Sequence, residues 1–193
     1  MTQYALFQTA IGWAGVAWSD RGLAGVHLPE PSPETARRSF LRRFPDAVEA
    51  PPLPKVEAVI DQIIDLLAGG KPDFADAPLD LSLTPEFNAR VYAVARTIPP
   101  GETLTYGEIA ARLGDRLLAR DVGQALGQNR WPIVVPCHRV TAANGKLGGF
   151  SARGGAATKL KLLAIEGAAI ATAPPPAAKR AKAPPPPQAD LFG

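Results

Sequence analysis

The chain has 193 residues, of which 46% are hydrophobic, so it can form one large domain or two small ones around a buried core. Its single cysteine excludes an internal disulfide framework, and no run of about 18 apolar residues predicts a transmembrane helix. The net charge of +3 is too small for a general attraction to nucleic acid, so any DNA binding must depend on local clusters of basic residues.

The first 80 residues predict a small domain that combines a sheet with helices. Short apolar runs across residues 4–28 favour a β-meander, with a turn at 19–22 and a further strand at 23–28. Residues 32–44 are predicted to form a charged helix, whose basic residues are most simply interpreted as a face exposed to solvent. These basic residues are Arg37, Arg38, Arg42 and Arg43.

Two more elements are predicted before residue 81. After a proline-rich linker, apolar residues recur at helical spacing from Val56 to Leu67, and Gly69-Gly70 ends that helix. Residues 79–83 alternate apolar and polar side chains, as an edge strand would.

Residues 84–128 predict three short helices. The first begins at Thr84-Pro85 and ends before Pro99. The second begins at Thr105 with a capping box, and the third covers roughly residues 119–128. The last two helices, joined by a tight turn that contains glycine, describe a helix-turn-helix. Small residues along its second helix suit close approach to a groove, and they equally suit tight core packing: Gly123, Ala125 and Gly127.

The only cysteine lies in the run 133–140, directly before a histidine. Residues 133–135 predict a buried strand or core segment, and Pro136 turns the chain at its end. A thiol beside an imidazole fits a reactive site, because the thiolate is the nucleophile and neighbouring groups set its population. Adjacency alone favours another interpretation, in which Cys137 is a small buried hydrophobic residue.

A glycine-rich loop and a final helix follow the cysteine. The loop covers residues 144–155. The helix is predicted at about residues 156–166, with Leu160, Leu163 and either Ala164 or Ile165 on its buried face. Residues 168–187 are rich in alanine, proline and lysine, cannot bury a core and predict a semi-extended linker.

The run Pro136-Cys137-His138-Arg139-Val140 resembles the signature of the O6-alkylguanine-DNA alkyltransferase family. Asn129, the Gly-Gly-Phe-Ser sequence at 148–151 and the Leu-Leu-Ala-Ile-Glu-Gly sequence at 162–167 extend the resemblance over residues 84–167. The resemblance implies an α+β fold. Its parts would be a small N-terminal antiparallel-sheet (RNase H-like) domain at 1–80, a mostly α-helical, winged helix-turn-helix-like domain at 81–167, and a disordered tail at 168–193.

The resemblance implies DNA repair by irreversible transfer of an alkyl group from O6-alkylguanine to Cys137. His138 corresponds to the residue that takes the thiol proton through a water, and Glu166 to the acid that orients this histidine. Adjacent residues of an extended chain point to opposite sides, which suits a bridging water. Asn129 corresponds to a hinge, and Tyr106 to a tyrosine whose hydroxyl assists departure of the guanine, although packing alone would also explain it. A thioether product has no easy hydrolysis, so one turnover per molecule is expected, with no cofactor and no metal site.

Because the target atom lies inside the duplex, the base must be flipped out. Family members work from the minor groove of double-stranded DNA, and Arg120 corresponds to the arginine that replaces the base. A phosphate contact alone is the alternative role for Arg120. Arg139 is expected to form a structural ion pair or to contact a phosphate. The resemblance assigns further DNA contacts to Tyr106, Ala119, Gly123 and Gln124, and a guanine pocket to Val140, Phe150 and Ser151.

The last residues resemble the bacterial sliding-clamp-binding peptide. Gln188 would be its polar anchor, followed by Asp190 and by an apolar pair, Leu191 and Phe192, that fits a pocket at the end of a flexible linker. A disordered terminus is the alternative. We expect a cytoplasmic location, because the N-terminus lacks a signal peptide and the chain has a single cysteine. We also expect a nucleoid-associated bacterial monomer with no membrane partner.

Three other functions compete with alkyl transfer. A non-catalytic module that recognises alkylated bases and recruits other repair factors would match relatives without the cysteine, so Cys137 argues against it. A helix-turn-helix transcription regulator would need a sensor domain or a dimerisation helix, which the sequence does not indicate. A cysteine hydrolase would need an oxyanion hole and would turn over repeatedly.

Overall fold

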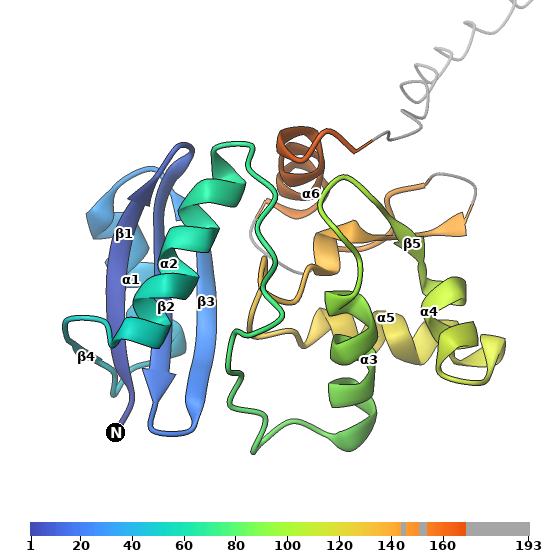
Figure 1. Ribbon diagram of the computed structural model, residues 1–193, viewed down its shortest axis with the longest axis horizontal. Helices are drawn as coiled ribbons and strands as arrows, with labels where there is room; N and C mark the ends of the chain where they lie inside the picture. The colour runs from blue at the N-terminus through green and yellow to red at the C-terminus, as the bar shows by residue number, and fades with distance from the viewer. Residues whose placement is uncertain (144–145, 151–153, 169–193) are drawn as a thin grey trace, which may run out of the picture.

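A four-stranded sheet forms the base of the N-terminal half of the computed structural model, which describes residues 1–143, 146–150 and 154–168. Three strands make the predicted antiparallel meander: β1 (Gln3–Thr9), β2 (Gly12–Ser19) and β3 (Gly22–Glu30). A short β4 (Val48–Glu49) pairs with β1 in parallel, so the sheet is mixed, with the order β3-β2-β1-β4. Figure 1 shows this sheet beside a mostly helical second half, which confirms the α+β class.

Two helices cover opposite faces of the sheet, α2 in front and α1 behind in Figure 1. Ser32 is the N-cap of α1 (Pro33–Arg43). Its hydroxyl accepts a hydrogen bond from Thr35 N at 3.2 Å in a capping box. Alternation along β1 places Tyr4 on the α1 face, where it packs with Phe40 and Phe44. α2 (Pro54–Leu67) buries its apolar stripe in the main core, which continues into the second half of the chain.

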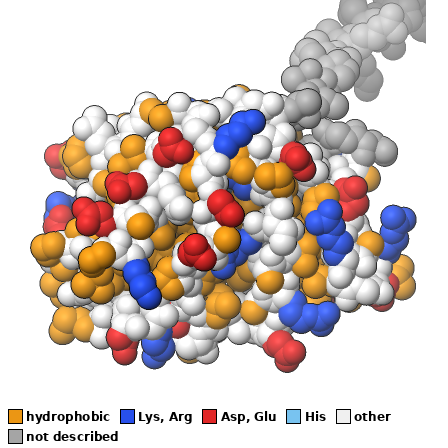
Figure 2. All heavy atoms as spheres, viewed as in Figure 1, with side chains coloured by type: hydrophobic (Ala, Val, Ile, Leu, Met, Phe, Trp, Pro, Cys, Tyr) orange, Lys and Arg blue, Asp and Glu red, His pale blue; other side chains and the backbone are white. Residues whose placement is uncertain are grey.

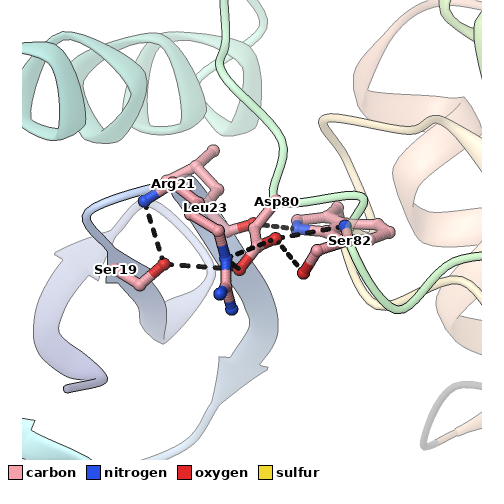
Figure 3. A network of polar contacts seen from close by, with 6 residues as sticks. Ser19, Arg21, Leu23, Asp80 and Ser82 are labelled. Carbon is pink, nitrogen blue, oxygen red and sulfur yellow. Dashed lines mark hydrogen bonds and ion pairs between the residues drawn. The ribbon is translucent and has the colours of Figure 1, made fainter.

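The connection after α2 is fixed to the sheet by Asp80, shown in Figure 3. Its backbone N–H donates to Leu23 O at 2.9 Å, and its carboxylate accepts from Arg21 Nε at 3.1 Å and from the Ser82 hydroxyl at 2.6 Å. The prediction of an edge strand at residues 79–83 is therefore wrong. Only Leu79 forms a bridge, to Leu23, because Asp80 then turns the chain through its local hydrogen bonds.

The second half contains the predicted helix-turn-helix. Thr105 and Glu108 form the expected capping box at the start of its first helix. None of the helices in the described part of the chain is long and apolar enough to cross a membrane. The elements are α3 (Glu86–Arg96), β5 (Leu104–Thr105), α4 (Tyr106–Arg112), the 3-10 turn η1 (Arg116–Leu118), α5 (Ala119–Gly127), the 3-10 turn η2 (Cys137–Arg139), β6 (Val140–Thr141) and α6 (Gly155–Ile165).

The apolar run before the cysteine is a buried core segment and not a strand. Ile133 has φ +77°, in the left-handed region, and Val135 N donates to Trp131 O at 2.7 Å. A β-branched residue in this region is unusual, and complete burial of Ile133 and Val135 holds the turn in place. The segment therefore delivers the following cysteine from a rigid turn inside the core.

The two halves meet along β3. Val26 N donates to Arg130 O at 2.9 Å, and Trp131 Nε1 donates to Leu23 O at 2.6 Å. Gly25 lies between these contacts, against the ring of Phe44 from α1. The end of α1 is thus held next to the segment that follows α5.

Replacing Gly25 with alanine should lower the free energy of unfolding by about 1–3 kcal/mol, the usual cost of overpacking. A Cβ would lie 2.5 Å from Cζ of Phe44 and 3.1 Å from Arg130 O. Urea denaturation measures the change. Gly127→Ala is the matched control, because a Cβ there meets nothing within 4 Å, and equal stabilities of the two variants would contradict the expectation.

Candidate functional site

Cys137 is held at the start of η2 by Asn129. Asn129 Nδ2 donates to Cys137 Sγ at 3.2 Å and to Val135 O at 2.8 Å, while Oδ1 accepts from Trp131 N at 2.8 Å. One side chain therefore connects the end of α5 to the turn that carries the thiol. The expectation of an extended chain at Cys137 and His138 is wrong, because these residues form a 3-10 turn after Pro136.

A fully buried ion-pair network lies beside the thiol. His138 Nε2 lies 2.7 Å from Glu166 Oε1, and Arg139 donates to both oxygens of the same carboxylate, at 3.0 and 2.9 Å. Arg139 also donates to Ile98 O at 2.5 Å. Arg139 thus forms a structural ion pair with Glu166, which was one of the two roles expected for it. Glu166, although distant in sequence, meets His138 because α6 ends over η2.

The charges of this network follow from its burial. Burial raises the pKa of Glu166, but hydrogen bonds from His138 and Arg139 and the positive charge of Arg139 outweigh this effect and bring the pKa to about 2. Burial lowers the pKa of His138, against the opposing effect of Glu166. A neutral imidazole that donates through Nε2 leaves Nδ1 as an acceptor, and Nδ1 has no hydrogen-bond partner among the described residues.

Lys159 is a site residue that the sequence did not indicate. It is fully buried on α6, and its Nζ donates to Val140 O at 2.5 Å and to Leu147 O at 2.6 Å. The predicted buried face of α6 is wrong at Leu160, which is exposed. The buried positions are 159, 162, 163 and 166, a regular helical stripe that ends at Glu166. The helical spacing of Lys159 from Leu162, Leu163 and Glu166 is the sequence feature that could have indicated its burial.

Lys159 and Cys137 influence each other's ionisation. Burial lowers the pKa of Lys159 to about 8, and negative charge on Cys137 opposes this shift. Burial raises the pKa of the Cys137 thiol, whereas the Asn129 hydrogen bond and the charge of Lys159 lower it. The lysine is therefore a cation placed to favour the thiolate.

Replacing Lys159 with methionine should slow reaction of Cys137 with iodoacetamide about tenfold at neutral pH, because losing this nearby cation raises the pKa of the thiol and lowers the thiolate population. The rate of carbamidomethylation as a function of pH, followed by mass spectrometry, measures the change. Lys161→Met removes a cation from an exposed position of the same helix and is the control. Identical pH profiles for both variants would leave Lys159 with a packing role only.

A pocket of about 570 Å³ opens above the thiol and runs along α5. Tyr106 closes one side, and its hydroxyl donates to Gly149 O at 3.1 Å. Burial and the negative charge of Cys137 raise the pKa of Tyr106, so the phenol keeps its proton. The predicted residues on the wall are Tyr106, Ala119, Arg120, Gly123, Gln124, Cys137 and Phe150.

One predicted pocket residue, Val140, does not line this wall. Val140 is fully buried, and its carbonyl accepts a hydrogen bond from Lys159 Nζ. Ser151 lies outside the described residues, as do the four tail residues, Gln188, Asp190, Leu191 and Phe192. The structure thus brings the thiol, the imidazole, Tyr106 and the start of α5 into one site.

Comparisons with known proteins agree on one family. Residues 86–168 match the model of the 6-O-methylguanine DNA methyltransferase DNA-binding domain. The chain is 38% identical to a methylated-DNA–protein-cysteine methyltransferase of Mycolicibacterium paratuberculosis, over 86% of this chain and 93% of that protein. It is 38% identical to a DNA base-flipping protein of Thermus thermophilus, over 80% and 95% of the two chains. A crystal structure of Mycobacterium tuberculosis OGT in complex with DNA superposes with a TM-score of 0.68 and 34% identity, covering 86% of this chain and 92% of that one.

Proposed function

The chain belongs to the family of methylated-DNA–protein-cysteine methyltransferases and acts in DNA repair by alkyl transfer to a cysteine, and we propose that Cys137 accepts the group with the help of His138 and Glu166. One observation carries this proposal: the only cysteine of the chain lies at the floor of the pocket along α5, beside a buried imidazole–carboxylate pair. Each such transfer consumes one protein molecule, because a thioether is not hydrolysed.

The proposed step forms one bond and breaks one bond. The thiol proton passes through a water to Nδ1 of His138, and the Cys137 sulfur attacks the alkyl carbon as the bond from that carbon to guanine O6 breaks. Guanine leaves as an anion that accepts a hydrogen bond from the Tyr106 hydroxyl, and it then takes up a proton from solvent water. Glu166 keeps the Nε2 proton of His138 in place and stabilises the imidazolium that forms.

The base reaches the pocket by leaving the duplex. Ala119, Gly123 and Gln124 line the pocket on the α5 side, so this face of the helix is proposed to lie in the minor groove. Arg120, exposed at the start of α5, is proposed to occupy the space that the flipped base leaves. Gly123 carries no side chain beyond a hydrogen atom, which allows the close approach that such a groove needs.

Intact-mass measurement tests the proposal. The protein is mixed with duplex DNA that carries one O6-methylguanine, and a gain of about one methylene, roughly 14 Da, is expected, saturating at one per molecule. Cys137→Ser should bind the same duplex without gaining mass. Lesion-selective binding without a mass gain in the unmodified protein would overturn alkyl transfer and favour a recognition module.

Two finer assignments are also proposed. The sequence of the tail supports binding to a bacterial sliding clamp, and a peptide of residues 184–193 should bind the clamp whereas its Leu191→Ala/Phe192→Ala version should not. No binding by the unmodified peptide at high micromolar concentration would end this idea. We further propose a cytoplasmic monomer, which light scattering and cell fractionation would test.

A further inference from the structure

Three arginines meet where the two halves of the protein join. Arg42 and Arg43 lie in the last turn of α1, and Arg130 follows α5. The guanidinium carbons of Arg43 and Arg130 lie 5.5 and 5.6 Å from the centroid of the Phe44 ring. Arg42 and Arg43 also line one pocket beside β3. These three residues, called the junction arginines below, therefore concentrate positive charge where the two halves join.

The junction arginines are not neutralised within the described part of the chain. None of them forms an ion pair with a described carboxylate, whereas Arg37, on the same helix, pairs with Glu49. Glu30 lines the same pocket as Arg42 and Arg43, and its Oε1 lies 3.4 Å from Nε2 of His27. Burial and the charge of Arg130 lower the pKa of Arg43, so the two cations repel each other. An anion placed between them would remove this repulsion.

The location of the cluster relates it to the reaction site. A hollow of about 240 Å³ is lined by Arg43, Gly127, Asn129 and Cys137, so it runs from the thiol to the end of α1. The pocket along α5 shares Gly127 and Cys137 with this hollow. Arg120 therefore lies at the start of α5 and the junction arginines lie beyond its end, with the thiol between them. The helix between the two positions, α5, is nine residues or about 13 Å long.

We propose that the junction arginines bind backbone phosphates of the damaged duplex, so that the N-terminal half takes part in DNA binding. This inference rests on the proposed function, because it is DNA lying along α5 that brings phosphates to the end of the helix. Each strand presents a phosphate about every 3.4 Å, so a duplex that contacts Arg120 continues past this end. The contact carries no sequence information, which suits a protein that must find a lesion in any sequence.

Salt dependence of DNA affinity provides the test. The double variant Arg42→Gln/Arg130→Gln spares Arg43, whose guanidinium donates to Val26 O at 3.3 Å. Lys55→Gln/Lys71→Gln removes the same charge from exposed positions on and after α2, away from α1, and is the control. Removing two phosphate contacts should reduce the slope of log affinity against log salt by about 2 and weaken binding about tenfold or more at low salt. The methyl-transfer rate at saturating DNA should not change.

A shorter duplex adds a second measurement. When the duplex is trimmed on the side of the lesion that faces α1, the difference between the unmodified protein and the arginine variant should disappear. A slope equal to that of the lysine control would overturn the proposal. So would a lower transfer rate at saturating DNA, since this would indicate a disturbed site. Failure of the unmodified protein to gain mass would sink the proposed function instead, while leaving the difference in slope measurable.

Discussion

Replacing Glu166 with glutamine should lower the free energy of unfolding at pH 7 by about 3–5 kcal/mol, because the charge of Arg139 would remain buried without a counter-charge. The same change should slow methyl transfer by about a hundredfold or more, since His138 would lose the carboxylate that orients it and stabilises its charged form. Urea denaturation and single-turnover mass measurements give the two quantities. Glu57→Gln, at an exposed position of α2, is the control.

The pH dependence of stability follows from the same residue. Its pKa is about 2 in the folded protein, below its usual value of 4.5, so the folded state favours the carboxylate. Glu166 therefore stabilises the fold fully above pH 4.5, by about 3 kcal/mol, and this contribution is lost as the pH falls towards 2. The glutamine variant should lack this part of the acid sensitivity. An equal loss of stability in both proteins between these pH values would contradict the assignment.

A second substitution separates stability from chemistry. In the double variant Glu166→Gln/Arg139→Met, no guanidinium remains buried without a partner, so much of the lost stability should return. The transfer rate should stay low, because His138 still lacks its carboxylate. Recovery of the rate together with the stability would show that Glu166 acts only through the fold.

Replacing Arg120 with alanine should lower the transfer rate from duplex DNA by about a hundredfold, since nothing would fill the gap left by the flipped base, and unstacking costs a few kcal/mol. Single-turnover mass measurements on an O6-methylguanine duplex test this. Arg116→Ala, in the exposed η1 turn before α5, is the control and should lose no more than a phosphate contact.

A lesion in single-stranded DNA sharpens this comparison. There, no complementary base holds the modified guanine in a stack, so Arg120→Ala should react almost as fast as the unmodified protein. A similar loss on single and double strands would contradict the gap-filling role and would indicate that Arg120 contributes charge alone.

Local signals made much of the fold predictable. The capping box at Thr105 involves residues only three apart, and the meander follows from alternation and turns, so these elements appear where expected. For the run at 133–135 the sequence left a buried strand and a core segment open, because apolar composition predicts burial and not strand pairing; the structure shows the core segment. The edge strand at 79–83 failed because the side chain of Asp80 competes with the sheet for hydrogen bonds.

The site divides in the same way. Cys137 and His138 could be identified because they are adjacent in a distinctive run, and Glu166 through the family resemblance alone. Lys159 could not, because a buried lysine is rare and its partners are carbonyls supplied by segments that only the fold brings together. Predicting Lys159 would require the correct buried face of α6. From the sequence, residue 160 is expected on that face, whereas the structure buries residue 159.

The tryptophan at the junction of the two halves has a spectroscopic consequence. Trp131 is buried, lies edge-on to Tyr92 and donates its indole N–H to β3, while the other two tryptophans, Trp13 and Trp18, belong to the sheet. With Trp13 and Trp18 changed to phenylalanine, fluorescence would come from the junction alone. Its emission would shift to the red when the halves separate and water reaches the indole. In that variant, Trp131 is therefore an intrinsic optical probe of the junction between the two halves.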